Sequence, residues 1–418
     1  MKNRLQAADN NKPRLVVFDV EGVLIPKNRF IFDVGKNLGN PQLLKMLSTG
    51  FLYEAGVVTL KSALKRIFKI MQGIKLEKLI EIFDEIPSKP VLQCLFYELK
   101  MRNCKIALIS SGIPTAIVEK LASGLGADYA VGIEVGVKDV TLTGKIWGDA
   151  IEKNGKLTVL KRILAAEKLS LDDCVVVADD RNNSCIFLSG MQKIGYNPDF
   201  VLRVKADTVV TGNLLKILPI IDGKLPQWTP PSTNALLRET IHASGFFIPV
   251  LAGLAGVFPV ALMICVISVF YSLSELARMN RQNMPVISSI TRNAASPTEL
   301  YEFTATPLYF AAGIFLTLLL FSAPVNGAAI AMFTLGDSTA SLAGGSISKK
   351  PLPFNKGKTW EGSFVGFLCA FLAGTFFIPP VLALIGAAVA MVIESLPSPI
   401  NDNIIVPLGT GLVLLLII

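Results

Sequence analysis

The sequence has few of the features of secreted, disulfide-bonded proteins. Its 418 residues include only six cysteines, and no two of them form a Cys-x-x-Cys pair. Several lie in apolar runs, such as Cys265 in LMICVI, where a buried, reduced thiol is the ordinary state. The N-terminal stretch MKNRLQAADNNKPR is polar and has no signal-peptide core. We therefore expect the first domain to stay in a reducing cytosol.

A nucleic-acid-reading motif is also missing. The formal net charge is +8, from 40 Lys and Arg against 32 Asp and Glu, but the basic residues are scattered along the chain. Nucleic-acid binding needs them clustered on one face, so we do not expect it. A surface near anionic lipid, or a preference for phosphorylated ligands, accounts for the charge more simply.

The composition indicates two regions of different character. The mean hydropathy of +0.53 is high for a soluble protein, whereas 17% charged residues is too many for a purely membrane one. Lys and Arg are dense up to about Arg203, and long apolar stretches begin at Phe246. The length allows two or three domains. We predict a first domain at 14–218, a Pro-rich linker at 219–234 and a membrane domain at 235–418.

The first domain alternates short apolar strands with amphipathic helices. RLVVFDV, KIALIS and CVVVAD are strand-like, and KLTVLKRILAAEKL has apolar residues at helical spacing. This alternation predicts a doubly wound, parallel α/β sheet, which binds its ligands at the carboxyl ends of the strands. The stretch at about 30–90 is helical throughout, and it predicts a small inserted cap.

Chemically useful residues follow the ends of these strands. The first strand delivers Asp19 and Glu21, one acid able to attack phosphorus and a second able to donate and recover a proton, with Gly22 permitting the turn. Later strand ends and one helix start deliver a hydroxyl, a cation and oxygen ligands suited to phosphate and Mg²⁺: Ser110, Lys156, Asp179 and Asn183.

This order of motifs over about residues 14–205 resembles the haloacid dehalogenase superfamily, in the branch around phosphoserine phosphatase. The resemblance implies a nucleophile at Asp19 that forms an aspartyl-phosphate, and a general acid/base at Glu21. It also implies phosphate binding by Ser110 and Lys156, and Mg²⁺ binding by Asp19, Asp179 and Asn183. Glu21 and Asn183 both replace a commoner Asp, and the second change removes a charge from the metal site. A decayed, binding-only domain is the alternative.

The membrane domain is predicted to be all-α, with six to seven spans. Phe246–Leu276 is too long for one simple span, and we interpret it as two short spans in a tight hairpin, or as a single tilted span. With seven spans, the loops carrying Arg278, Arg281 and Arg292, then Lys349 to Lys358, fall on the cytosolic side and the C-terminus outside. Further candidate spans are 307–322, 325–344, 363–377, 380–393 and 404–418.

A second polar cluster runs from Gly336 to Ser363, in GDSTASLAGGSISKKPLPFNKGKTWEGS. Asp337 lies in an apolar segment, where an ionisable group is costly and usually functional. Positive-inside anchoring accounts for Lys349 and Lys350, but not for the acids. The remaining polar candidates near the same membrane edge are Asn355, Lys356, Lys358, Glu361, Glu394 and Asp402.

This block resembles the family of dolichol kinases, phytol kinases and CTP-transferring lipid enzymes, over about residues 235–418. The resemblance implies Mg²⁺-dependent phosphoryl transfer from CTP to a polyprenol. Catalytic roles would fall to Asp337 and Glu361, nucleotide phosphates to Lys356 and Lys358, and the metal to Glu394 and Asp402. Arg238, His242, Glu275 and Arg278 also look like this family, although a structural contact is an equal interpretation of His242.

The sequence therefore predicts an integral membrane kinase of an isoprenoid alcohol, fused to a cytosolic phosphatase domain acting on a related phosphate ester. The membrane would be a prokaryotic plasma membrane or the endoplasmic reticulum. Two alternatives stay open. A CTP-dependent cytidylyltransferase would release a CDP-lipid instead of a lipid phosphate. A transporter or scaffold that only binds phosphates would tolerate Asp337→Asn.

Overall fold

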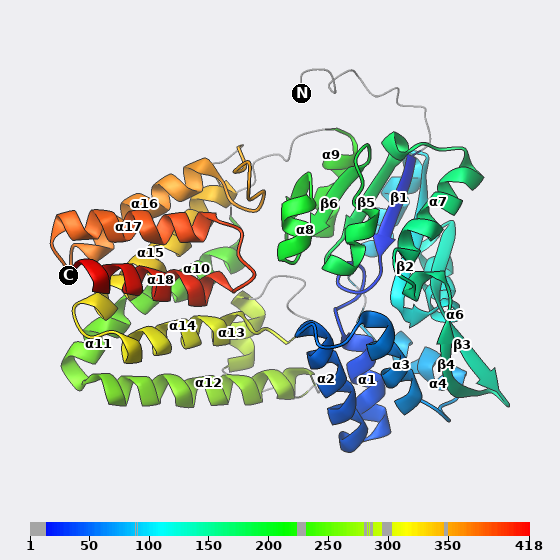
Figure 1. Cartoon of the computed structure of the whole chain (residues 1–418), viewed down its shortest axis with the longest axis horizontal. Helices are drawn as coiled ribbons and strands as arrows, with labels where there is room; N and C mark the ends of the chain where they lie inside the picture. Colours follow the sequence, from blue (N-terminus) through cyan, green and yellow to red (C-terminus); the bar gives the residue numbers. More distant parts are fainter. Residues whose placement is uncertain are drawn as a thin grey trace. The chain divides into compact units, whose positions relative to one another are not determined.

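The computed structural model describes residues 14–87, 89, 91–223, 231–279, 282, 284, 287–294, 303–346 and 350–418 (Figure 1). The chain divides into two compact units, Met1–Leu225 and Pro226–Ile418. Part of the expected linker, residues 224–230, lies outside the described residues, as do Arg281 and Lys349 of the expected basic loops. Each unit is described by itself.

The N-terminal unit is built on a seven-stranded sheet in the order β4-β3-β2-β1-β5-β6-β7. All neighbouring strands are parallel except the β3–β4 pair. β1 lies in the middle, between β2 and β5, so its carboxyl end meets those of two neighbours. The strands are β1 Arg14–Asp19, β2 Cys104–Pro114, β3 Tyr129–Lys138, β4 Thr141–Trp147, β5 Cys174–Ala178, β6 Gln192–Tyr196 and β7 Thr208–Val210.

The continuous apolar run of β1 is explained by burial on both faces. Val16 and Phe18 face one side, where Phe18 stacks on Phe96 at a centroid distance of 5.3 Å. Leu15 and Val17 face the opposite side. The first face is covered by α5 Leu92–Met101, α6 Thr115–Leu125 and α9 Ile217–Ile221, and the second by α7 Gly155–Glu167 and α8 Phe200–Lys205. This is the doubly wound arrangement that the sequence predicted.

A helical cap is inserted between β1 and β2. It consists of α1 Arg29–Leu38, α2 Asn40–Glu54, α3 Leu60–Ile70 and α4 Leu76–Asp84. Figure 1 shows α1, α2 and α3 gathered beyond the carboxyl end of β1. The cap shares one apolar core with the sheet, because Phe30, Met46 and Leu64 join the same cluster as Phe18. Its helices therefore form a roof over the strand ends.

The C-terminal unit is helical in its described part. Its helices are α10 Thr233–Ser244, α11 Ile248–Ala255, α12 Val257–Met279, α13 Ile287–Ala294, α14 Thr306–Leu320, α15 Val325–Ser346, α16 Trp360–Gly374, α17 Pro380–Ser395 and α18 Asp402–Ile417. α15 is the central helix: Ala328 to Phe333 are fully buried, and α10, α14, α16, α17 and α18 pack against it.

Small residues let α15 and α16 approach closely. A Cβ added to Gly366 would lie 2.8 Å from the carbonyl oxygen of Gly336, and one added to Gly362 would lie 2.7 Å from that of Ala340. Glycine and alanine at four-residue spacing on facing helices allow this contact, as in many membrane helix pairs. The small residues Gly336, Ala340, Gly362 and Gly366 thus serve helix packing.

The stretch at 246–276 is divided into two helices of unequal length. A break at Gly256, with φ of +89°, separates the eight-residue α11 from the 23-residue α12. Of the described helices, α12 is long and apolar enough to cross a membrane, whereas α14, α16, α17 and α18 are apolar but shorter. Only the second half of the expected hairpin therefore reaches spanning length.

Candidate functional site

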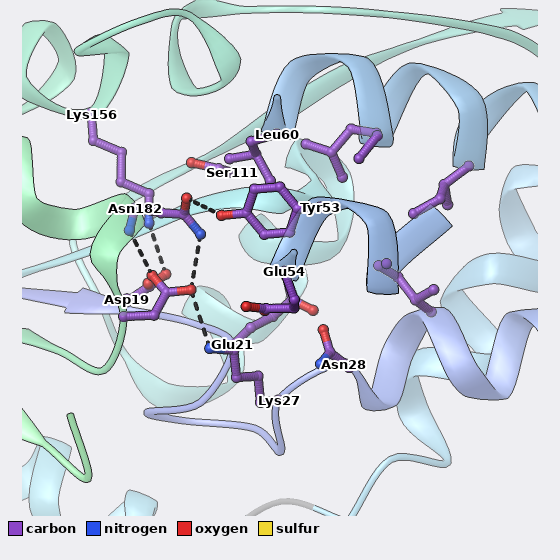
Figure 2. A pocket seen from close by; sticks show the side chains of 17 residues that line it. Asp19, Glu21, Lys27, Asn28, Tyr53, Glu54, Leu60, Ser111, Lys156 and Asn182 are labelled. Atoms are coloured by element: carbon purple, nitrogen blue, oxygen red, sulfur yellow. Dashed lines mark hydrogen bonds and ion pairs between the residues drawn. The ribbon is translucent and has the colours of Figure 1, made fainter. Parts of the chain in front are cut away.

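Asp19 is the last residue of β1, and two groups from distant parts of the chain hold its carboxylate. Its Oδ1 lies 3.0 Å from Nζ of Lys156 and accepts a hydrogen bond from the backbone N–H of Val20 at 2.8 Å. Its Oδ2 accepts a hydrogen bond from the side-chain amide of Asn183. Asp19 is therefore fixed in place, with its oxygens oriented by one cation and one amide; Figure 2 shows Asp19 beside the cation, Lys156.

Lys156 and Asn183 are themselves joined. Lys156 lies in the first turn of α7 and donates to Oδ1 of Asn183 at 2.7 Å. The amide nitrogen of Asn183 also donates to Asp180 at 3.0 Å. The resemblance implied that Asn183 binds Mg²⁺ through its oxygen, but here that oxygen faces Lys156. Asp180 instead joins the acidic group described next.

Three carboxylates meet beside the end of β1. Asp19, Asp179 and Asp180 each offer one oxygen, and these oxygens all lie within 4.8 Å of one another. Lys27 lies 3.4 Å from Asp180 and 3.7 Å from Asp179. Oδ1 of Asp179 is buried and has no hydrogen-bond partner among the described residues. A buried, unpartnered carboxylate oxygen among acids fits a divalent cation such as Mg²⁺, which prefers oxygen ligands.

The titration behaviour of these groups agrees with that fit. Burial raises the pKa of Asp19 above its ordinary value, although Lys156 opposes the shift. Burial, followed by the charges of Asp180 and Asp19, raises the pKa of Asp179 well above its usual range. Burial alone would lower the pKa of Lys27, but Asp180 and Asp179 outweigh it and raise that pKa. Both raised carboxyl pKa values mean that the ionised forms of Asp19 and Asp179 are disfavoured without a further cation beside them.

Glu21 lies across from Asp19, in the turn that follows β1. Burial, then repulsion from Asp19 and Asp180, raises its pKa to about 7. A Cβ added to Gly112 would lie 2.3 Å from Oε2 of Glu21, so only glycine leaves room for this carboxyl. A carboxyl that titrates near neutral pH suits a group that must both donate and accept a proton.

The two serines that end the apolar part of β2 have different positions. Oγ of Ser110 accepts hydrogen bonds from the N–H groups of Gly112 and Ile113, both at 3.1 Å, and the residue is 1% exposed. Ser111 donates to the carbonyl of Ala150 at 2.8 Å and lines the cavity, as Gly112 does. The predicted phosphate ligand Ser110 therefore lies beneath this turn and orders its amides.

A cavity of about 90 Å³ lies between these residues and the cap. Its lower wall contains Asp19, Glu21 and Lys156, and its upper wall comes from α1, α2 and α3. Figure 2 shows Tyr53 and Leu60 of the cap across the cavity from Asp19. The hydroxyl of Tyr53 donates to Asn182 and so joins the cap to the loop after β5.

The C-terminal unit brings four of its predicted site residues together. Nζ of Lys358 contacts a carboxylate oxygen of Glu394 and lies 3.4 Å from Asp402 and 3.8 Å from Asp337. These residues come from the loop before α16, from α17, from the start of α18 and from α15. Glu394 is only 2% exposed. A buried carboxylate requires a partner, and Lys358 supplies it.

His242 of α10 borders the same cluster. Its Nε2 lies 3.6 Å from Oδ2 of Asp337 and 3.2 Å from Oδ1 of Asn403. Its ring packs against Phe310 and Phe333, with centroid distances of 4.3 and 5.0 Å. Both interpretations of His242 given by the sequence, a structural contact and a place in the site, are compatible with this position.

The other predicted residues of this unit lie apart from Lys358. Glu361 lines a separate open hollow with Lys350 and Trp360. Lys356 is half-buried and forms no ion pair with any described residue.

The predicted residues of α10 and α12 form local pairs. Glu275 and Arg278 pair with each other at 2.7 Å, and Glu275 accepts a hydrogen bond from the N–H of Thr304 at 3.0 Å. Arg238 pairs with its neighbour Glu239 at 3.0 Å.

Sequence reasoning missed Lys27, Tyr53 and Asn182 in the N-terminal site. Lys27 follows the first motif by six residues, but nothing in the sequence distinguishes it from the other lysines of this basic region. Tyr53 belongs to the cap, and only the fold brings it to Asn182, which is 129 residues away. A signal for Asn182 was present, because it immediately precedes the predicted ligand Asn183.

Comparison with known proteins identifies the N-terminal unit. A family model of haloacid dehalogenase-like hydrolases matches residues 16–182. The N-terminal unit is a haloacid dehalogenase-like domain. Phosphoserine phosphatase of Methanocaldococcus jannaschii is 27% identical to the chain over 199 residues, which cover 48% of this chain and 92% of that protein. The expected family of the first domain is confirmed.

A solved structure of phosphoserine phosphatase with bound substrate aligns with 50% of this chain and 99% of its own, with 26% identity and a TM-score of 0.47. A C-terminal region of the chain is similar to a different protein, a probable chloroplastic phytol kinase of Zea mays. That match has 31% identity over 152 residues and covers 32% of this chain and 48% of the maize protein. The chain therefore joins a haloacid dehalogenase-like domain to a phytol kinase-like region.

Proposed function

We propose that the chain is a membrane-bound enzyme with two phosphate-handling sites. The N-terminal site hydrolyses a phosphomonoester through Asp19, and the C-terminal site transfers a phosphoryl group from CTP to an isoprenoid alcohol. The observation that carries the first activity is the position of Asp19 among Lys156, Asn183 and two further aspartates. The second rests on the cluster around Lys358, together with the similarity to a probable phytol kinase.

Hydrolysis begins with attack of an Asp19 oxygen on phosphorus, which forms an aspartyl-phosphate as the ester P–O bond breaks. Glu21 gives its proton to the departing alcohol oxygen. Glu21, now ionised, then takes a proton from water as the water oxygen attacks the phosphorus. Asp19 is released, and inorganic phosphate carries the water oxygen away.

Lys156 holds the attacking carboxylate and offsets the charge of the phosphoryl oxygens. The N–H groups of Gly112 and Ile113 both donate to Oγ of Ser110, so Ser110 would act by ordering the turn beside the phosphoryl end of the cavity. Asp19, Asp179 and Asp180 would hold Mg²⁺, which supplies charge neutralisation for the phosphoryl group. Asn183, predicted as a metal ligand, would act here by orienting Asp19 through its amide.

In the C-terminal site, we assign hydroxyl activation to Asp337 and the nucleotide phosphates to Lys356 and Lys358. Lys358 is held among three carboxylates, and its ammonium group would offset the charge of nucleotide phosphates beside them. Glu394 and Asp402 would hold Mg²⁺, which neutralises the CTP phosphates. Glu361 lies in the first turn of α16, and we assign it a catalytic role beside Asp337.

The apolar exterior of the C-terminal unit supports an integral membrane location. Phe258, Val266, Ile267 and Phe270 of α12 are each between 46% and 75% exposed. Such a surface is unfavourable in water and favourable in lipid. We propose that the haloacid dehalogenase-like domain lies on the cytosolic side, where CTP is available.

The test uses the full-length protein in detergent with γ-labelled CTP, Mg²⁺ and a panel of isoprenoid alcohols. We expect label on the alcohol, with at least about a 100-fold loss in Asp337→Asn and no loss in Asp19→Asn. Hydrolysis of p-nitrophenyl phosphate should be lost in Asp19→Asn and unchanged in Asp337→Asn. Formation of a CDP-lipid from a lipid phosphate, or label transfer that Asp337→Asn leaves unchanged, would contradict the kinase assignment.

A further inference from the structure

The roof of the phosphatase cavity is aliphatic. Ile31 of α1 and Leu60, Ala63, Leu64 and Ile67 of α3 line the side that faces away from β1. Ala63, Leu64 and Ile67 are each 3% exposed, and Leu64 and Ile67 belong to the shared apolar core of cap and sheet. The alcohol part of a bound phosphomonoester would therefore meet methyl and methylene groups.

The two lysines, Tyr53 and Glu54 of the cavity lining are each engaged with a residue at the strand ends or in the loop after β5. Lys156 and Lys27 are the two cations in its lining, and both pair with aspartates beside the end of β1. Tyr53 bonds Asn182, and Glu54 lies 3.7 Å from Arg181. These cap side chains thus engage the loop after β5, which belongs to the phosphoryl end of the cavity.

A zwitterionic alcohol such as serine needs a cation for its carboxylate, because an unpaired charge against an apolar wall is costly. Among the described lining residues, no further cation is present to supply one. An apolar alcohol has the opposite requirement, since each methylene that leaves water contributes about a four-fold gain in binding. The lining therefore favours an apolar alcohol over a charged one.

The size of the cavity limits the length of that alcohol. A volume of about 90 Å³ holds several water molecules, each of which needs roughly 10–15 Å³ on the same scale. A phosphoryl group and a short branched chain fit this space, whereas a chain of about twenty carbons would have to leave it. The roof is formed by packed helix faces of the shared core, so it presents one compact apolar wall.

We propose that the phosphatase site takes a short, branched, apolar phosphomonoester, of the size of a five-carbon prenyl phosphate, and discriminates against phosphoserine. This inference rests on the proposed hydrolytic function of Asp19. In the reaction, the ester P–O bond breaks, the prenyl alcohol leaves with a proton from Glu21, and water supplies the new phosphate oxygen. The chain would then handle isoprenoid alcohols and their phosphates at both of its sites.

The test measures phosphate release by the full-length protein from 3-methylbut-2-enyl phosphate, L-phosphoserine and geranylgeranyl phosphate. We expect kcat/KM for the five-carbon ester to exceed that for L-phosphoserine by about 100-fold or more. Equal or faster hydrolysis of L-phosphoserine would overturn the inference, and so would activity confined to the twenty-carbon ester. Hydrolysis of p-nitrophenyl phosphate, lost in Asp19→Asn, reports the proposed function separately.

Matched variants test the apolar roof. Leu60→Arg places a cation at the half-buried start of α3, and we expect it to lower the preference for the five-carbon ester over L-phosphoserine by at least ten-fold. Leu47→Arg makes the same change on α2, where Leu47 is 46% exposed and does not line the cavity, and the preference should not change. An unchanged preference in Leu60→Arg would contradict a role for the roof.

Ligand binding tests the same preference without substrate turnover. 3-Methylbutylphosphonate should raise the melting temperature of the full-length protein more than 2-amino-4-phosphonobutanoate, the phosphonate analogue of phosphoserine, at equal concentration. If no ester is hydrolysed, the proposed function fails and this comparison still decides the inference. A larger shift with the amino acid analogue would overturn it.

Discussion

Single atoms decide the geometry around the nucleophile. Gly22 has a φ of +79°, which allows the chain to turn sharply after Asp19 and Glu21. Its N–H donates to the carbonyl of Ile25 at 2.8 Å and closes that turn. A Cβ at Gly22 would lie 2.1 Å from Oδ2 of Asp179. The absence of one methyl group therefore gives Asp179 its place in the acidic cluster.

Gly22→Ala should lower the phosphatase kcat/KM by at least about 100-fold and raise the Mg²⁺ concentration needed for half-maximal activity, because Asp179 must move. Gly126→Ala is the matched control. Gly126 has a similar φ of +75°, but nothing lies within 4 Å of its added Cβ. It should lose about 1–2 kcal/mol of stability from left-handed strain alone and keep its activity. Normal activity and Mg²⁺ dependence in Gly22→Ala would contradict this account.

At the scale of elements, the loop before α16 is held to the ends of α17 and α18 by polar contacts. Lys358 contacts Glu394 and lies 3.4 Å from Asp402. The side-chain amide of Asn355 donates to the carbonyl of Ser395 at 3.1 Å. Ser363 and Ser395 share a hydrogen bond at 2.9 Å. The loop that carries the predicted phosphate ligands is therefore fixed to the helices that carry the predicted metal ligands.

Lys358→Met should destabilise the C-terminal unit by about 3–5 kcal/mol, because Glu394 would remain buried without its cation. Lys356→Met removes a neighbouring lysine that forms no ion pair with a described residue, so it should leave the melting temperature unchanged. Thermal unfolding in detergent gives both values. Restoration of stability by Glu394→Gln in the Lys358→Met background would show that the loss comes from the unpaired charge, and equal melting temperatures of both lysine variants would contradict it.

Local patterns predicted the elements that depend on local chemistry. The strands ending at Asp19 and Ala178 follow from apolar runs bounded by turn residues, and their parallel pairing follows from the helices between them. The break at Gly256 was harder to place, because an apolar stretch with prolines and glycines is compatible with several kinks. The structure has a break, as the hairpin interpretation expected, but only the second of the two helices reaches spanning length.

The N-terminal site also contains residues that the sequence could predict and residues that it could not. Residues next to strand ends, such as Asp19 and Lys156, could be named because topology alone brings strand ends together. Lys27 and Tyr53 could not, because their contacts depend on how the cap packs. The direction of the Asn183 side chain was also beyond the sequence, since an amide offers either its oxygen or its nitrogen to a neighbour. The roles of all these residues stay predictions until variants are measured.

At the scale of the whole molecule, the apolar surface of the C-terminal unit determines where the protein is found. Apolar side chains are exposed on several helices of the C-terminal unit, including Phe258, Phe364, Phe376 and Val381, each more than 60% exposed. Lipid or another apolar partner must cover such a surface. We therefore expect the chain to remain with membranes after extraction with sodium carbonate at alkaline pH and after washing with 1 M salt. Release by either treatment would contradict integration into the bilayer.

The order of the elements along the chain also determines when each part can fold during synthesis. β1 is translated before both of its neighbours: β2 follows after the cap and α5, and β5 follows after α6 and α7 have also been made. All the strands of the sheet nevertheless precede Val257, where the long apolar α12 begins. Because domains fold in the order in which they are translated, a nascent chain arrested before Val257 already holds every residue of the phosphatase site. Membrane insertion would then start from a chain whose first enzyme is already complete.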